Sequence, residues 1–243
     1  MRTLRFGLLL VLSGSALSQT AAAPAFDVAS IRPSPAKFGS YIRYQPGGSL
    51  SAMSWIRQVV QVAYGLHDYQ VLGGPGWLNT DRYNIEAKAA NPDASKDDIN
   101  VMMQTLLSDR FKLKFHRETK DFDVYDLVVD KNGSKMKPLK DGEDFHCTRD
   151  NTEICGLTNP AQVASFLRSV TGKPVFDKTG ITGRYNILLT FDVYEPKGAT
   201  PPEGYNKPLL EDALGDQLGL QLVPRKDTLP VLVIDSIERP SEN

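Results

Sequence analysis

Histidines are the only side chains of the usual kind that could act as a general base at neutral pH, and the chain has three of them. They are His67, His116 and His146, and none lies in a recognisable catalytic motif. Neither G-x-S-x-G nor H-E-x-x-H occurs, so the signatures of a serine hydrolase nucleophile and of a zinc protease are missing. The sequence therefore predicts no catalytic residue and no cofactor. A hydrolase whose site is assembled between distant segments stays open.

The two cysteines, Cys147 and Cys155, are further residues that could do chemistry. In an exported chain, a pair this close in sequence favours a disulfide that closes a short loop. The alternatives are free thiols and a metal site that also uses His146 and Asp150, but the C-x7-C spacing fits none of the usual zinc patterns. We therefore predict a bridge between Cys147 and Cys155 and no metal.

A glycine-rich segment with aromatic residues is the candidate partner surface. It places Tyr64, Tyr69 and Trp77 around Gly73 and Gly74. Such loops can present aromatic anchors to a partner, although aromatic residues beside a turn can equally form the edge of a core. The partner would be an unknown protein or small-molecule ligand.

The segment Asp177-Lys178-Thr179-Gly180 looks like the phosphorylation loop of P-type ion pumps. Those pumps are large membrane proteins with separate nucleotide-binding domains, whereas this chain is short. We predict a tight turn between two strands instead.

The hydrophobic periodicity predicts four helices with strands between them. The helices follow Ser54, Ser95 and Asn159 as N-caps, and the fourth covers residues 209–218. Alternation in residues 112–118 and an apolar run in 124–129 predict a hairpin. Residues 220–223 and 229–234 predict two closing strands.

One pattern occurs twice. Arg82-Tyr83-Asn84-Ile85 recurs at residues 184–187, and residues 107–115 recur as 214–222, in the same order. We therefore predict an α+β protein of two tandem α-β-β-α-β-β pseudo-repeats, with antiparallel sheets covered by helices. Residues 26–140 would hold the N-terminal strands and the first repeat, and residues 141–243 the cysteine loop and the second.

The first 18 residues have the charged start, apolar stretch and small-residue end of a signal peptide, with cleavage there or as late as residue 23. This predicts export to the periplasm or the exterior. No other segment is apolar enough to cross a membrane, so we expect no membrane span in the mature chain. The net charge is −1, and losing Arg2 and Arg5 with the leader makes it more acidic, which argues against nucleic acid as a partner.

Several separated segments resemble a large soil-associated family of exported bacterial proteins of unknown function. They are residues 26–33, 73–78 with Arg82-Tyr83, 107–113, 174–180 with 183–185, and 233–235 with 238–243. The resemblance implies a bacterial envelope setting. Because the family's domain also occurs attached to membrane sensor peptidases, it implies a sensory or binding role, with no catalytic residues to carry over. We expect a non-enzymatic binding or interaction module of the envelope, the alternative being a hydrolase with a site between the repeats.

Overall fold

A computed structural model describes residues 23–35, 39–140, 153–191 and 208–240. The predicted signal peptide and Cys147 lie outside this part, and for Cys155 only the backbone is described, so the signal and the bridge stay predictions. The chain divides into two compact units. The first comprises Met1–Tyr64, Asn79–Lys112 and Arg239–Asn243, and the second comprises Gly65–Leu78 and Leu113–Glu238.

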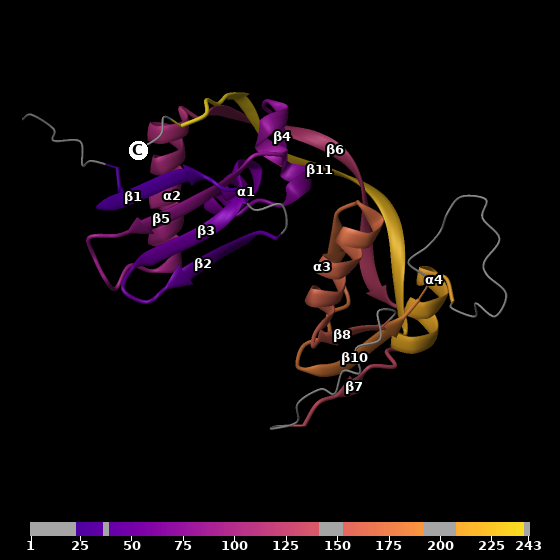
Figure 1. Cartoon of the computed structure of the whole chain (residues 1–243). Helices are drawn as coiled ribbons and strands as arrows, with labels where there is room; N and C mark the ends of the chain where they lie inside the picture. Colours follow the sequence, from indigo (N-terminus) through magenta and orange to yellow (C-terminus); the bar gives the residue numbers. More distant parts are fainter. Residues whose placement is uncertain (1–22, 36–38, 141–152, 192–207, 241–243) are drawn as a thin grey trace, which may run out of the picture. The chain divides into compact units, whose positions relative to one another are not determined.

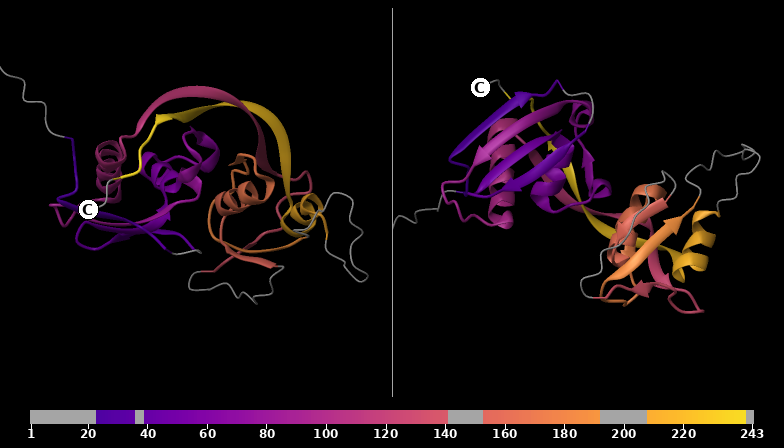
Figure 2. Two further views of the ribbon diagram at one scale, coloured as in Figure 1. Left: turned by 45° about the horizontal axis from the view of Figure 1, so that its top comes forward. Right: turned by 60° about the horizontal axis from the view of Figure 1, so that its bottom comes forward.

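The first unit is an antiparallel sheet with two helices on one face (Figures 1 and 2). Its strand order is β1 (Val28–Pro33), β5 (Arg82–Lys88), β3 (Ser49–Trp55) and β2 (Tyr41–Gln45). The helices α1 (Ile56–Tyr64) and α2 (Lys96–Phe111) lie side by side.

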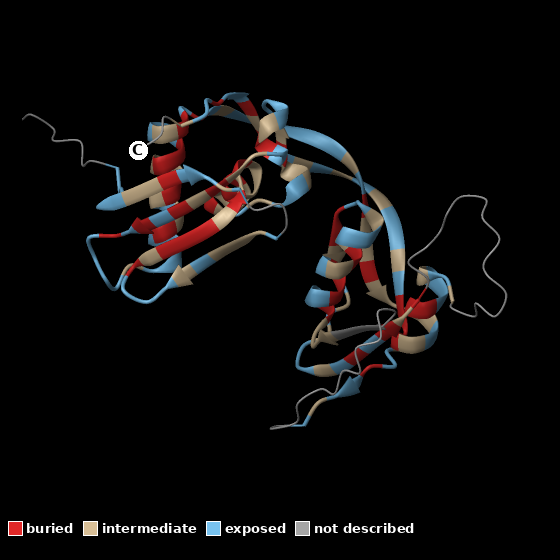
Figure 3. Ribbon diagram, viewed as in Figure 1, coloured by how far each residue is buried: buried red, intermediate tan, exposed pale blue. Residues whose placement is uncertain are grey.

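Alternation along β5 decides which face of this sheet the helices cover. Tyr83, Ile85 and Ala87 are buried, and in a strand the residues between them point to the opposite face. Figure 3 shows buried and more exposed residues along the strands of this sheet. The helix α2 begins as predicted, because the Asp98 N–H donates to Ser95 Oγ at 3.1 Å and Asp98 accepts from the Ser95 N–H in return.

The second unit holds the other two sheets. Their strand orders are β7-β10-β8 and β4-β11-β6-β9. The strands are β4 (Val71–Gly73), β6 (Lys114–Val129), β7 (Lys137–Pro138), β8 (Glu153–Leu157), β9 (Val175–Asp177), β10 (Tyr185–Thr190) and β11 (Leu220–Ser236), and the short turns η1 (Asp68–Gln70) and η2 (Gly76–Asn79) flank β4.

Helix α3 (Pro160–Thr171) begins at the predicted N-cap Asn159, whose Oδ1 accepts from the Gln162 N–H at 2.9 Å. The fourth predicted helix is present as α4 (Leu210–Ala213), continued by the π turn η3 (Leu214–Leu218). These helices pack on a core formed by apolar side chains from β6, α3, β9, β10, α4, η3 and β11.

The strands β6 and β11 are single long strands, which corrects the prediction of a hairpin in residues 112–129 and of two separate closing strands. They pair antiparallel from Leu220 opposite Val129 to Ser236 opposite Lys114. The polar middle of β6 looks like a turn, yet it contains no glycine, proline or asparagine. Polar groups bond across the ladder there: Thr228 Oγ1 donates to Asp121 Oδ1 at 2.6 Å.

The fold class is α+β, as predicted, because helices cover sheets in which most neighbouring strands are antiparallel. Two short strands depart from this rule: β4 pairs parallel with β11, and β9 pairs parallel with β6. Within the described ranges, no helix has both the length and the apolar character needed to cross a bilayer.

Candidate functional site

The candidate site is centred on Trp55 and Arg82, which are cross-strand neighbours at the ends of β3 and β5. The guanidinium carbon of Arg82 lies 4.4 Å from the centroid of the indole ring, which is the distance of a cation–π contact. Both residues alternate with buried neighbours, Ser54 and Tyr83, so they point to the sheet face away from the helices. Trp55 lines one hollow of the first unit and Arg82 lines another, and we call the pair together with both hollows the Trp55–Arg82 site.

The Asp81 hollow, of about 370 Å³, lies on the Arg82 side of the pair. It is lined by Pro33, Ser34, Thr80, Asp81, Arg82, Tyr83 and Arg239. Arg239 donates to Asp81 Oδ2 from Nε at 3.0 Å and from Nη2 at 2.8 Å, and Thr80 Oγ1 donates to Asp81 Oδ1 at 2.8 Å. The bonds from Arg239, helped by the one from Thr80, hold the pKa of the Asp81 carboxyl below its ordinary value. This carboxylate therefore stays ionised at neutral pH and is unsuited to act as a general acid.

Three segments that carry the family resemblance meet in the Asp81 hollow. Pro33 at the end of β1 pairs with Tyr83, and the Ser34 N–H donates to the Arg82 carbonyl at 2.8 Å. Arg239 reaches the same place from the closing segment of the chain. Sequence reasoning singled out these segments but missed their convergence, because nothing local in the sequence indicates that they touch.

The Arg57 hollow, of about 250 Å³, lies on the Trp55 side. It is lined by Trp55, Arg57, Gln58, Gln61 and Asn79. Arg57 Nε donates to Asn79 Oδ1 at 2.7 Å, and Ser54 Oγ donates to Gln58 Oε1 at 2.6 Å. Burial lowers the pKa of the Arg57 guanidinium from its ordinary value. Because α1 turns Ile56, Val59, Val60 and Ala63 into the core, its polar residues are left to line this hollow.

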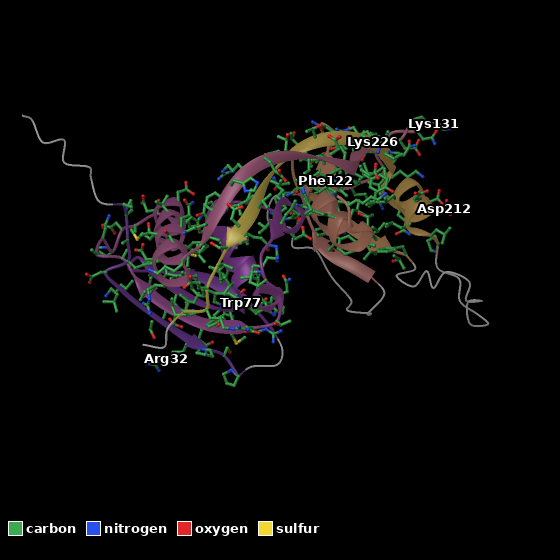
Figure 4. The ribbon with its side chains drawn as sticks, turned by 90° about the horizontal axis from the view of Figure 1, so that it is seen from above. Arg32, Trp77, Phe122, Lys131, Asp212 and Lys226 are labelled. Atoms are coloured by element: carbon green, nitrogen blue, oxygen red, sulfur yellow. The ribbon has the colours of Figure 1, made fainter. Side chains whose placement is uncertain are left out.

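The predicted partner surface is distributed over both units. Tyr64 ends α1 in the first unit, whereas Tyr69 and Trp77 belong to the second. Tyr69 stacks on His67 with ring centroids 5.6 Å apart and meets Phe122 edge-on at 5.6 Å. Figure 4 shows where Trp77 and Phe122 lie on the ribbon. The role of these aromatic residues as a partner surface stays a prediction.

Gly73 and Gly74 have a packing role in the turn after β4. Both have positive φ, of 70° and 75°. A Cβ on Gly73 would lie 2.9 Å from the Ile234 carbonyl oxygen, and one on Gly74 would lie 2.5 Å from a methyl carbon of Leu78. These glycines therefore allow the turn to approach β11 closely.

Among the histidines, His116 lies beside two carboxylates. His116 Nδ1 lies 2.7 Å from Asp235 Oδ1, and its Nε2 lies 3.8 Å from Glu118 Oε2. Carboxylates thus neighbour both ring nitrogens, where a hydrolase would need a hydroxyl or thiol nucleophile beside one of them. The pKa of His67 is lowered, chiefly by burial, and His146 lies outside the described residues. In the described ranges no group of three or more His, Cys, Asp or Glu residues could hold a metal ion.

Comparison with known proteins identifies the family. A family model with the description "Protein of unknown function (DUF3738)" matches residues 57–237. The chain belongs to the DUF3738 family. The match covers nearly all of the second unit and less than half of the first, where it includes Arg57 and Arg82 but not Trp55 or Arg239. It confirms the expected resemblance to an uncharacterised family, while soil association and export stay predictions. Searches of curated proteins and of solved structures each found no significant match.

The DUF3738 domain also contains the segment that looks like a phosphorylation loop, and there it forms a turn after β9. Asp177 Oδ1 accepts from the Thr179 N–H at 3.0 Å and from Thr179 Oγ1 at 2.8 Å. The carboxylate therefore closes its own turn, as predicted.

Proposed function

We propose that this protein is an exported, non-enzymatic binding module of the bacterial envelope, located in the periplasm or outside the cell. It binds a small ligand at the Trp55–Arg82 site. The observation that carries the proposal is an aromatic ring with a guanidinium 4.4 Å from its centroid, set between two polar hollows.

The geometry favours recognition over chemistry. Tryptophan and arginine are, with tyrosine, the residue types enriched where the binding energy of protein interfaces is concentrated. Several polar side chains of the two hollows, such as Asp81 and Asn79, are already held by hydrogen bonds, so little ordering of them is required when a ligand arrives. The acid of the Asp81 hollow has a lowered pKa, whereas a general acid needs a raised one.

We also propose that the scaffold consists of two copies of an α-β-β-α-β-β unit. Tyr83 on β5 pairs with Pro33 of β1, and Tyr185 on β10 pairs with Pro138 of β7. The residue that follows β1 or β7 also makes the same hydrogen bond in each copy. The Ser34 N–H donates to the Arg82 carbonyl at 2.8 Å, and the Leu139 N–H donates to the Arg184 carbonyl at 2.9 Å.

The later elements of the two copies also correspond. The short strand of each copy, β4 or β9, joins a long strand in parallel. The last helix of each copy ends in the left-handed conformation, at Lys112 with φ of 52° and at Gly219 with φ of 66°. This agreement in pairing and in caps supports a duplication.

The duplication has a consequence for ligand number. Ile85 of the first copy pairs with Ala52, and its counterpart Ile187 pairs with Leu157. Trp55 follows Ala52 by three residues and Pro160 follows Leu157 by three residues, so Pro160 is the counterpart of Trp55. The second copy therefore has no aromatic ring at the corresponding place. We expect one ligand per chain.

Thermal unfolding with a panel of neutral sugars, sugar acids, amino acids and short peptides tests the binding function. A ligand of the site raises the melting temperature by mass action. We expect the unmodified protein to show this increase in melting temperature. We expect Arg82→Met to lose it, because methionine keeps an apolar contact with Trp55 but removes the charge. The control is Arg32→Met, since Arg32 is an exposed arginine on the neighbouring strand that projects from the first unit (Figure 4). No increase with any compound, or equal increases in all three proteins, would contradict the proposal.

Export has its own test. Mass spectrometry of the protein from the envelope or medium of its host is expected to find a chain that starts between residues 19 and 24. A protein retained in the cytoplasm with an intact leader would contradict export.

The alternative function is a hydrolase, and its supporting observation is the 2.7 Å contact between His116 and Asp235. Purified protein would then hydrolyse a peptide, ester or glycan substrate, and His116→Ala would abolish the activity. This result would replace the binding function by the hydrolase.

A further inference from the structure

We infer that the Arg57 hollow binds the carboxylate end of a sugar acid. This inference rests on the proposed binding function and names the ligand class of the same site. It follows from the hydrogen-bonding capacity, the charge and the composition of the five residues that line the hollow.

The hollow offers hydrogen-bond donors. Arg57 Nε can only donate, so the Asn79 amide must turn its oxygen towards it, at 2.7 Å, and the amide nitrogen remains as a donor. The Gln58 oxygen accepts from the fully buried Ser54 hydroxyl at 2.6 Å, which likewise leaves its amide nitrogen as the donor end. A ligand that fits must therefore supply acceptors.

The charge of the lining selects an anion. Arg57 is the one charged residue among the five, and no carboxylate of the described residues lines the hollow. Burial lowers the pKa of Arg57, yet an arginine stays protonated, so the lining presents a positive charge that attracts an anion. A carboxylate suits this role, because its two oxygens match the donor geometry of a guanidinium.

The remainder of the ligand follows from the same lining. The set contains no aliphatic side chain, and the indole of Trp55 is its one large apolar surface. A ring with hydroxyl groups and one apolar face fits this composition better than a hydrocarbon does, because its hydroxyls exchange hydrogen bonds with Gln61 and the amides. The volume of about 250 Å³ is below the range of pockets for drug-sized ligands, which indicates a single sugar ring or the end of a longer chain.

Calorimetric titration with glucuronate tests the inference, with glucose as the neutral sugar of matching ring size. We expect one glucuronate per chain and binding of glucose at least about tenfold weaker. Arg57→Gln is expected to weaken glucuronate binding by about tenfold or more, which corresponds to about 1.4 kcal/mol. The matched control is Arg43→Gln in the same unit, whose guanidinium lies 4.6 Å from the Tyr41 ring and outside both hollows, and it should bind as the unmodified protein does.

A second variant keeps the test decisive if Arg57→Gln fails to fold. Asn79 is exposed, and Asn79→Asp places a carboxylate beside Arg57 that competes with that of the ligand. This variant should lose glucuronate binding while its thermal unfolding stays cooperative. Unchanged glucuronate binding in it would overturn the inference.

The outcomes separate this inference from the proposed function. Absence of glucuronate binding, or equal binding by Arg57→Gln, overturns the sugar acid. If glucose binds as tightly as glucuronate and Arg82→Met loses both, the binding function is supported while the acid specificity is overturned. Absence of binding by every compound in the panel overturns both.

Discussion

The substitution Gly219→Ala tests how closely the start of β11 packs in the second unit. Gly219 follows η3 with φ of 66°, in the left-handed region that favours glycine. A Cβ there would lie 2.2 Å from the Gly133 carbonyl oxygen and 2.8 Å from the Lys135 nitrogen. Both neighbours are backbone atoms, so they can give way only if the whole turn moves.

The expected loss follows from what holds that turn. The Asp130 N–H donates to the Gly219 carbonyl at 2.9 Å, and the Lys135 N–H donates to the Leu218 carbonyl at 2.9 Å. A left-handed residue with a Cβ costs about 1–2 kcal/mol, and each lost hydrogen bond costs about 0.5–1.5 kcal/mol. We therefore expect Gly219→Ala to lower the free energy of unfolding by about 2–5 kcal/mol, measured by urea unfolding followed by circular dichroism.

Gly215→Ala is the matched control in the same helical turn. A Cβ on Gly215 would find Asp130 Oδ2 at 3.7 Å, which is an ordinary contact, and its φ is not positive. This change is expected to be neutral or to stabilise by up to about 1 kcal/mol, because alanine forms helix better than glycine. If Gly219→Ala costs less than about 1 kcal/mol, or if both variants behave alike, the close approach at Gly219 is wrong.

The remaining predictions concern the core, the response to acid and the cysteines. Phe111→Ala and Leu218→Ala should each lower the free energy of unfolding by about 2–5 kcal/mol, because both side chains are almost completely buried; nearly neutral denaturant melts for both would contradict their proposed equivalence. Hydrogen bonds from Arg239 lower the pKa of the Asp81 carboxyl in the folded protein. The bond between the two residues therefore stabilises the fold above about pH 4, and this stabilisation is lost as the pH falls further and the carboxyl is protonated. Asp81→Asn should flatten the fall in melting temperature between about pH 4 and 2, and an unchanged pH profile would argue against this bond. Thiol titration of unfolded, unreduced protein should find no free thiol, and two reactive groups per chain would show that Cys147 and Cys155 are not bridged.

Local features made the helices predictable. The caps at Ser95 and Asn159 depend on residues within three positions, and both form as expected. The long strands were harder to predict, because the polar middle of β6 is extended only through its pairing with residues 226–230 of β11. Register between distant strands leaves no local periodicity in the sequence.

The candidate site could not be predicted, for the same reason. Trp55 and Arg82 become neighbours only through the register of β3 with β5, and Arg239 reaches Asp81 from the far end of the chain. In the sequence, Arg82 belongs to the motif that occurs twice, and Arg239 belongs to the C-terminal segment that carries part of the family resemblance. Neither feature indicates that the two residues line the same hollow. Sequence reasoning placed the aromatic surface at Tyr69 and Trp77 instead, because those residues are adjacent to a glycine-rich turn.

The two tryptophans of the chain, Trp55 and Trp77, allow a direct test of where the ligand binds. Protein labelled with ¹⁵N at the indole nitrogen gives one NMR signal for each ring, and the signal lost in Trp55→Phe assigns the pair. During titration with glucuronate, the Trp55 signal is expected to shift in a saturable manner while the Trp77 signal stays in place. A shift of Trp77 with no change at Trp55 would contradict binding at the Trp55–Arg82 site and would locate the ligand near the glycine-rich turn.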